Sequence, residues 1–231
     1  MENKQYDLCR EVLRRLDAAH VLDGLILIGS WCLLLYQDYF RGIAYRPSIR
    51  TRDLDFLIPL PQRFSGKVDL HALLQDLGFV LNFKGDAGWI TFQHPDLILE
   101  FLVPERGRGS LKPTAVPALG VNAQALRFLD FLAVKPVRVQ FHGITVRVPH
   151  PANFALHKLV IAPRRKSDKA DRDRTQAVQI LQALVDSGEA AVLRRRFIAL
   201  PQRWQKPIRT ALAAMNPDFA FAVGFRGKSQ A

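Results

Sequence analysis

Apolar positions along this chain follow two periods, one typical of helices and one of strands. Residues 3–19 place apolar side chains at helical spacing, with Arg10, Glu11 and Arg14 between them, which predicts an amphipathic helix. Helices are also predicted at residues 31–40 and 68–77. Short apolar or alternating runs predict strands at 25–28, around Asp53 and Asp55, and at 79–83, 89–93, 97–103, 133–141 and 144–148. The mixture indicates an α+β protein with a mixed, mostly antiparallel sheet flanked by helices.

The second part of the chain is predicted to be helical. Pro149 and Pro151 precede a helical region that lasts to about residue 215. A helix over 154–161 is expected to leave His157 or Lys158 near its margin, and a second helix is expected over 168–186. Residues 41–50 and 104–121 read as loops, and the tail from 217 reads as mobile. We therefore expect a domain over 1–149, a basic helical domain over 150–216 and a tail over 217–231.

Three acidic residues and one Gly-Ser turn form the candidate functional site. The first strand ends in Gly29-Ser30 and a helix follows, so backbone N–H groups and a hydroxyl are available to an anion. Asp53 and Asp55 project together because strand side chains alternate, and Glu100 lies in a later apolar strand. Two neighbouring carboxylates repel one another unless a cation lies between them. Their hard oxygen atoms are ligands that favour Mg²⁺ or Mn²⁺. The pattern predicts a metal and triphosphate site.

The charge of the chain indicates an acidic partner. The formal net charge is +12 and the pI about 10.2, which favours a nucleic acid or nucleotide over an anionic membrane surface. Residues 158–209 contain thirteen lysines and arginines against five acids. Cys9 and Cys32 both lie in apolar helical patterns and read as core residues in a reducing compartment. The N-terminal residues lack the pattern of a signal peptide, so we expect a cytoplasmic protein with no membrane partner.

The order of these motifs resembles the nucleotidyltransferase superfamily related to DNA polymerase beta. The resemblance covers residues 25–103, and the helices after residue 154 are similar to a bacterial branch that includes the abortive-infection toxins of type IV toxin-antitoxin systems. It implies the nucleotidyltransferase fold and transfer of a nucleoside monophosphate from an NTP to an acceptor hydroxyl, with pyrophosphate release. RNA or tRNA is the preferred acceptor, with a protein or small molecule next. A cognate antitoxin protein is an implied partner.

The resemblance assigns roles to matching positions. Gly29 and Ser30 would hold the triphosphate, Asp53 and Asp55 would bind two divalent ions, and Glu100 would bind one ion and help deprotonate the acceptor. Further residues would lie beside the nucleotide: Lys158, Lys169 and Asp173. Basic residues are candidate nucleic-acid contacts: Arg164, Arg165, Lys166, Arg194, Arg195 and Arg196. Twenty-two residues separate Ser30 from Asp53, more than the superfamily usually has, so an insertion is expected between Phe40 and Ile49.

Other interpretations of the acidic pair remain open. A haloacid-type phosphatase or a metal-dependent glycosyltransferase also uses Asp-x-Asp, but Leu57 stands where the phosphatase needs threonine. A nuclease of the Asp, Glu-x-Lys kind has lysine where this chain has Leu102. The fold is also compatible with a non-catalytic module that binds nucleotide, nucleic acid or a toxin-antitoxin partner. Arg106 and Arg108 form a further basic pair in the long loop, at a spacing that fits no phosphate-binding motif.

Overall fold

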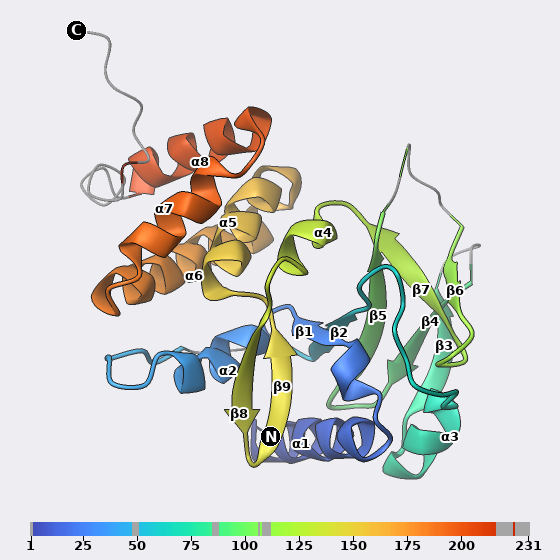
Figure 1. Cartoon of the computed structure of the whole chain (residues 1–231). Helices are drawn as coiled ribbons and strands as arrows, with labels where there is room; N and C mark the ends of the chain where they lie inside the picture. The colour runs from blue at the N-terminus through green and yellow to red at the C-terminus, as the bar shows by residue number, and fades with distance from the viewer. Residues whose placement is uncertain are drawn as a thin grey trace, which may run out of the picture. The chain divides into compact units, whose positions relative to one another are not determined.

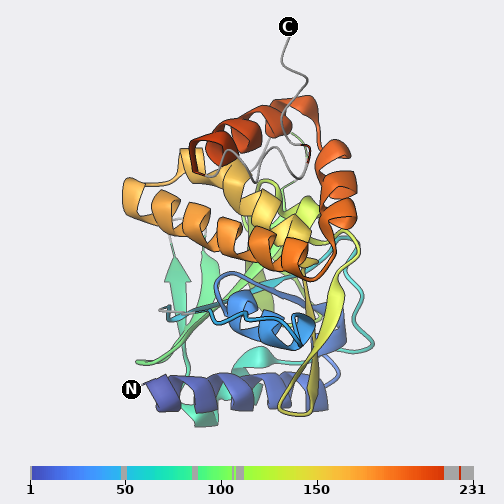
Figure 2. The same ribbon diagram turned by 90° about the vertical axis from the view of Figure 1, so that its left-hand side faces the viewer.

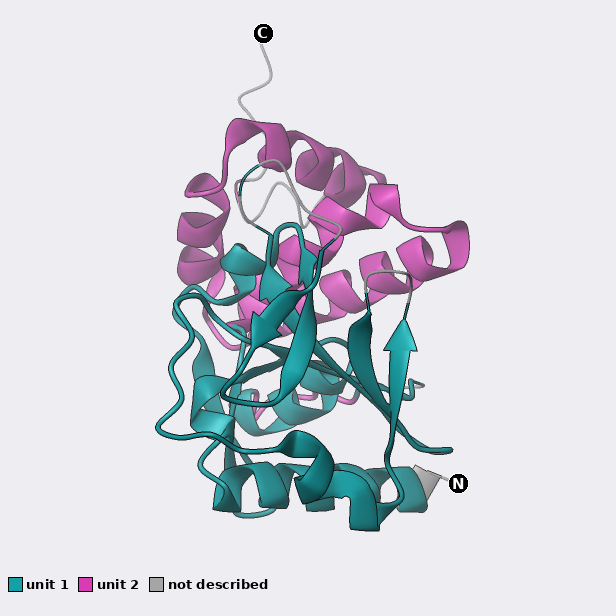
Figure 3. Cartoon of the chain, turned by 90° about the vertical axis from the view of Figure 1, so that its right-hand side faces the viewer, with its two compact units in different colours: residues 1–39, 47–149 teal, residues 40–46, 150–231 magenta. Residues whose placement is uncertain are grey.

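A computed structural model describes residues 2–47, 51–84, 88–105, 107, 112–215 and 224. The chain divides into two compact units, residues 1–39 with 47–149 and residues 40–46 with 150–231 (Figure 3). In the described part of the chain, no helix is both long and apolar enough to cross a membrane. The fold is a mixed α+β arrangement.

The first unit contains a mixed sheet whose central order is β1-β2-β5-β4-β3 (Figure 1). β1 pairs antiparallel with β2, β2 pairs parallel with β5, and β4 pairs antiparallel with both β5 and β3. The bounds of these strands are Ile26–Ile28, Asp53–Leu57, Val80–Lys84, Trp89–Gln93 and Ile98–Pro104 for β1 to β5. The predicted strands and their antiparallel hairpins are confirmed.

The two faces of the sheet differ because strand side chains alternate. Leu54, Phe56, Leu99 and Phe101 are buried on one face, whereas Asp53 is exposed on the other. Two helical segments adjoin one another beside the sheet, since the Arg15 guanidinium donates a 2.9 Å hydrogen bond to the Leu73 carbonyl (Figure 1). They are α1 (Glu2–Ala18) and α3 (Leu70–Leu74), the latter continued by η2 (Gln75–Leu77). The predicted amphipathic first helix is confirmed.

A small apolar cluster covers one end of the carboxylate-bearing face. Leu57 and Leu102 are buried together with Ile26 and Ile28 of β1. The other members, Leu129 and Leu132, come from α4 (Leu129–Leu132). Leu57 and Leu102 follow Asp55 and Glu100 by two residues on the same strands, so the acids lie directly beside the covered part of the face.

The sequence-based expectation of a loop over 104–121 is wrong in part. β6 (Thr114–Val116) pairs antiparallel with β7 (Val121–Leu126), and β7 pairs parallel with β5. The run over β7 is Val-Asn-Ala-Gln-Ala-Leu, whose alanines give a weak alternation, and β6 has three residues only. Thr114 and Val116 of β6 are β-branched, but the strand is too short to show a period, and β7 has Val121 as its one β-branched residue.

A separate hairpin and a helix complete the first unit. β8 (Val137–Phe141) and β9 (Ile144–Val148) pair antiparallel across a turn at His142-Gly143, both with positive φ. The predicted hairpin is therefore confirmed, with a later start of its first strand. α2 (Trp31–Tyr39) follows the Gly-Ser turn and contacts β8. Its Tyr36 hydroxyl donates a 2.8 Å hydrogen bond to the Pro149 carbonyl.

The second unit is a group of helices arranged around α5 (Figure 2). The helices are α5 (Pro151–Ile161), α6 (Ser167–Asp186), α7 (Ala190–Ile198) and α8 (Gln202–Met215). Residues 40–46 belong to this unit, where the Phe40 and Tyr45 rings lie 5.0 Å apart and the Gln179 amide donates a 3.3 Å hydrogen bond to the Arg46 carbonyl. Residues 40–46 of the predicted insertion thus contact α6.

Candidate functional site

The turn between β1 and α2 is built around the carboxylate of Asp55. Gly29 has φ +75°, a left-handed conformation that favours glycine. A Cβ at this position would lie 2.2 Å from Asp55 Oδ2, so the carboxylate occupies the space of a side chain. Helix α2 begins two residues later, and the first turn of a helix leaves backbone N–H groups without intrahelical partners. Ser30 lies in that turn and is partly buried.

The three predicted acids lie on two adjacent parallel strands. Asp53 and Asp55 share one face of β2, with Asp53 exposed and Asp55 partly buried. Asp55 pairs in register with Glu100 of β5, and Glu100 is also partly buried. The structure therefore places Asp55 beside Glu100 in the sheet and beside Gly29, which follows the end of β1, with Asp53 two residues before Asp55 on its strand.

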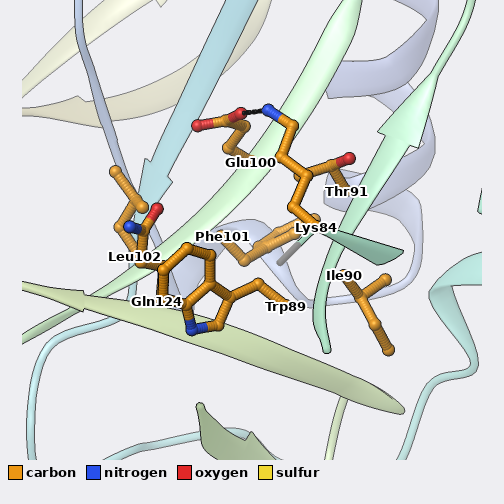
Figure 4. A pocket seen from close by; sticks show the side chains of 8 residues that line it. All are labelled: Lys84, Trp89, Ile90, Thr91, Glu100, Phe101, Leu102 and Gln124. Carbon is orange, nitrogen blue, oxygen red and sulfur yellow. Dashed lines mark hydrogen bonds and ion pairs between the residues drawn. The ribbon is translucent and has the colours of Figure 1, made fainter. Parts of the chain in front are cut away.

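Glu100 forms an ion pair that the sequence did not suggest. The Lys84 ammonium, at the end of β3, donates a 2.5 Å hydrogen bond to Glu100 Oε1 (Figure 4). The two side chains are 43% and 23% exposed, and pairs with that exposure typically contribute only about 0–1 kcal/mol to folding. Only a prediction of strand register would have found Lys84, because it is sixteen residues from Glu100 and follows no motif.

The acids do not form a ready three-ligand metal centre. Within the described ranges, no group of three or more His, Cys, Asp or Glu side chains is close enough to hold a metal ion. The Asp53 and Asp55 pair supplies the hard oxygen donors that one divalent ion prefers. Glu100 is engaged by Lys84 instead. The residues present fit one ion at the aspartate pair better than two ions shared among three acids.

In the second unit, two predicted residues form a buried ion pair, and an exposed third one, Arg165, adjoins it. The Lys158 ammonium donates a 2.6 Å hydrogen bond to Asp173 Oδ1, and an Arg165 nitrogen lies 3.3 Å from Asp173 Oδ2. Lys158 and Asp173 are 6% and 4% exposed, and the Lys158 ammonium also lies 5.0 Å from the centre of the Phe154 ring. The structure brings Lys158 and Asp173 together, whereas Lys169 is exposed on the first turn of α6.

The expectation that His157 or Lys158 lies at the margin of its helix is wrong. His157 is 8% exposed, and α5 is buried from Pro151 to Val160 because other helices surround it. Burial, followed by the charges of Lys158 and Arg165, lowers the pKa of His157 from 6.5 to about 3. Burial and the charge of Arg196 lower the pKa of His150 to about 4. Both rings are therefore neutral at pH 7.

The comparison with protein families decides the identity of the fold. A family model described as nucleotidyltransferase matches residues 8–197, which is more than half of the chain. The chain belongs to the nucleotidyltransferase family. Members of this family act on NTPs, usually with a divalent metal, and the membership supports transfer of a nucleoside monophosphate in general. No curated protein sequence is matched.

One solved structure agrees with this nucleotidyltransferase fold. The chain is similar to an antigenic nucleotidyltransferase-like protein from Paracoccidioides brasiliensis, with 14% identity and a TM-score of 0.51, over 97% of this chain and 94% of that chain. ANT(2'')-Ia in complex with adenylyl-2''-tobramycin matches with 13% identity and a TM-score of 0.43, over 96% and 97% of the two chains. At such low identity, the first similarity supports the fold alone.

The remaining predicted contacts of the nucleotidyltransferase are scattered over its helical unit. Arg194 and Arg195 are exposed on α7, and Arg196 is partly buried. Arg164 donates a 2.8 Å hydrogen bond to the Val160 carbonyl, and Lys166 is exposed before α6. Other predictions lie outside the described residues: Arg106, Arg108, Ile49, the Gly85-Asp86 turn and all of the tail over 217–231 except Gly224.

Proposed function

We propose that this nucleotidyltransferase transfers a nucleoside monophosphate from an NTP to an acceptor hydroxyl and releases pyrophosphate. The observation that supports this proposal most strongly is the close approach of Asp55 to Gly29. A triphosphate bound at the start of α2 would lie directly beside the carboxylate that binds the ion. The proposed catalytic domain is residues 1–149, with a helical domain over 150–216 and a tail over 217–231.

Each candidate site residue of the first unit has a proposed role. Gly29 and Ser30 bind the terminal phosphates through backbone N–H groups and the hydroxyl. Asp53 and Asp55 would hold Mg²⁺ or Mn²⁺, which when bound neutralises charge on the phosphates. Glu100 accepts a hydrogen bond from the acceptor hydroxyl and orients it for attack on the alpha phosphate. The chain thus contributes mainly position and charge.

RNA, in particular tRNA, is the proposed acceptor, and a protein side chain or a small molecule remains the other choice. The support is the formal net charge of +12 and the exposed cations of the helical unit, which include Lys166, Lys169, Arg194 and Arg195. Lys158 and Asp173 are buried with each other, and nucleotide contact by them stays a prediction. A cognate antitoxin partner and a cytoplasmic location also stay predictions.

The test is transfer of label from each alpha-labelled NTP to total bacterial RNA and protein, with Mg²⁺ or Mn²⁺. We expect label in RNA with the native chain and with Asp17→Asn, a control at an exposed acid on α1. Label is expected to be absent with Asp53→Asn and Asp55→Asn combined. Label found only in protein would mean that a protein, and not RNA, is the acceptor. Equal transfer by the double variant would overturn the assignment of the site.

A further inference from the structure

Glu100 already has a cation beside it, and the sequence motifs do not account for this cation. We infer that Lys84 takes the place of a second divalent ion at Glu100, so that the site holds one ion, between Asp53 and Asp55. The inference rests on the proposed function, because it concerns the same carboxylates. It makes Lys84 a positioning residue that acts through Glu100.

The register of the sheet places Lys84 and Glu100 across a single intervening strand. Lys84 of β3 pairs with Trp89 of β4, and Glu100 of β5 pairs with Thr91 of β4. Trp89 and Thr91 are two positions apart, so their side chains lie on one face, and Lys84 reaches diagonally over that face to Glu100. Figure 4 shows this reach, with the ammonium on one carboxylate oxygen and Thr91 beside it.

The surroundings of the pair form a small pocket of the first unit. Its wall includes Trp89, Leu102 and Gln124 besides Lys84 and Glu100 (Figure 4). Leu102 and Thr91 lie beside Glu100 on the same face of the sheet. They are 5% and 4% exposed, so little water reaches the carboxylate from their side. A partly buried carboxylate in such a place is stabilised by a partner of opposite charge. Lys84 supplies it from the chain itself.

The position of the Lys84 ammonium favours one divalent ion over two at these carboxylates. A second divalent ion at Glu100 would lie within a few ångströms of Lys84 Nζ, which is 2.5 Å from Oε1. Like charges at that separation repel one another, and more strongly than in bulk water because the Glu100 side chain is only 23% exposed. The ammonium therefore keeps the second ion out and leaves Glu100 Oε2 for the acceptor hydroxyl.

The experiment counts bound Mn²⁺ by equilibrium dialysis of the full chain with inorganic tripolyphosphate, a probe that needs no choice of base. We expect one Mn²⁺ per native chain. Lys84→Met keeps the length of the side chain without its charge, and we expect two ions with it. Lys84→Met combined with Glu100→Gln should return the count to one. Lys67→Met, at an exposed lysine of the same unit, is the matched control and should keep one.

The outcomes separate this inference from the proposed function. Two ions on the native chain, with one lost in Glu100→Gln, would overturn the inference and leave the proposed function standing. A count of one with Lys84→Met would also overturn the inference, because the ammonium would then not exclude an ion. No Mn²⁺ on the native chain, or an unchanged count after Asp53→Asn with Asp55→Asn, would overturn the proposed function itself. Far-ultraviolet circular dichroism checks that each variant is folded.

Discussion

Gly29→Ala should damage catalysis far more than it damages folding. The new Cβ would lie 2.2 Å from Asp55 Oδ2, so the carboxylate must turn away from the phosphate-binding turn. The backbone φ of +75° adds the ordinary cost of a left-handed alanine, about 1–2 kcal/mol. In a chain of this size that cost lowers Tm by about 2–8 °C. Transfer should fall by about 100-fold or more, because the ion loses a correctly placed ligand.

Gly143→Ala is the matched control for this prediction. Gly143 has a similar φ of +81° and nothing within 4 Å of its added Cβ, so it incurs the backbone cost without the collision. Thermal unfolding and NTP-dependent label transfer are measured on both variants. Both variants should lose stability, Gly29→Ala somewhat more because of the collision, but only Gly29→Ala should lose transfer. Equal transfer by both variants would refute the argument that Asp55 and Gly29 act as one unit.

Three further predictions concern both units. Lys158→Met should lower the free energy of unfolding, by at most about 3–5 kcal/mol, because Asp173 loses its buried amine and keeps only Arg165, 3.3 Å away. Adding Asp173→Asn should recover part of that loss in a denaturant double-mutant cycle. The folded pKa of His157 lies below its ordinary 6.5, so its contribution to stability is complete above pH 6.5 and declines as pH falls toward 3. In that range the free energy of unfolding should fall by about 1.4 kcal/mol per pH unit. His157→Gln should reduce this slope in unfolding measured from pH 7 to 4. Asp55→Asn should abolish transfer but keep RNA binding in a gel-shift assay. Arg195→Glu should weaken RNA binding but keep NTP turnover without RNA. Unchanged RNA binding by Arg195→Glu would remove α7 from the proposed RNA interface.

Local pattern was sufficient to predict the elements that carry the acids. Leu54 and Phe56 alternate with Asp53 and Asp55, and that period fixed both the strand and the face of the carboxylates. The Gly29-Ser30 turn was predicted because a glycine after an apolar strand marks a change of direction. These features depend on neighbours in sequence, which a single chain displays directly.

Contacts between distant segments were not predictable in the same way. The pairing of Lys84 with Glu100 depends on the register of β3, β4 and β5. The burial of Lys158 depends on how the other helices surround α5, and its charge made an exposed margin the simpler expectation. β7 was missed because Ala123 and Ala125 give little hydrophobic contrast. In each case tertiary packing outweighed the local signal.

The most direct test of the central claim is the rate of metal-dependent pyrophosphate release in the presence of acceptor RNA. The native chain and the Asp17→Asn control are compared with Asp55→Asn, each with the NTP that labels best. The account predicts equal rates for the first two and a rate lower by about 100-fold or more for Asp55→Asn. A rate for Asp55→Asn within a factor of a few of the native rate would contradict it, because the carboxylate beside Gly29 would then play no part in the reaction.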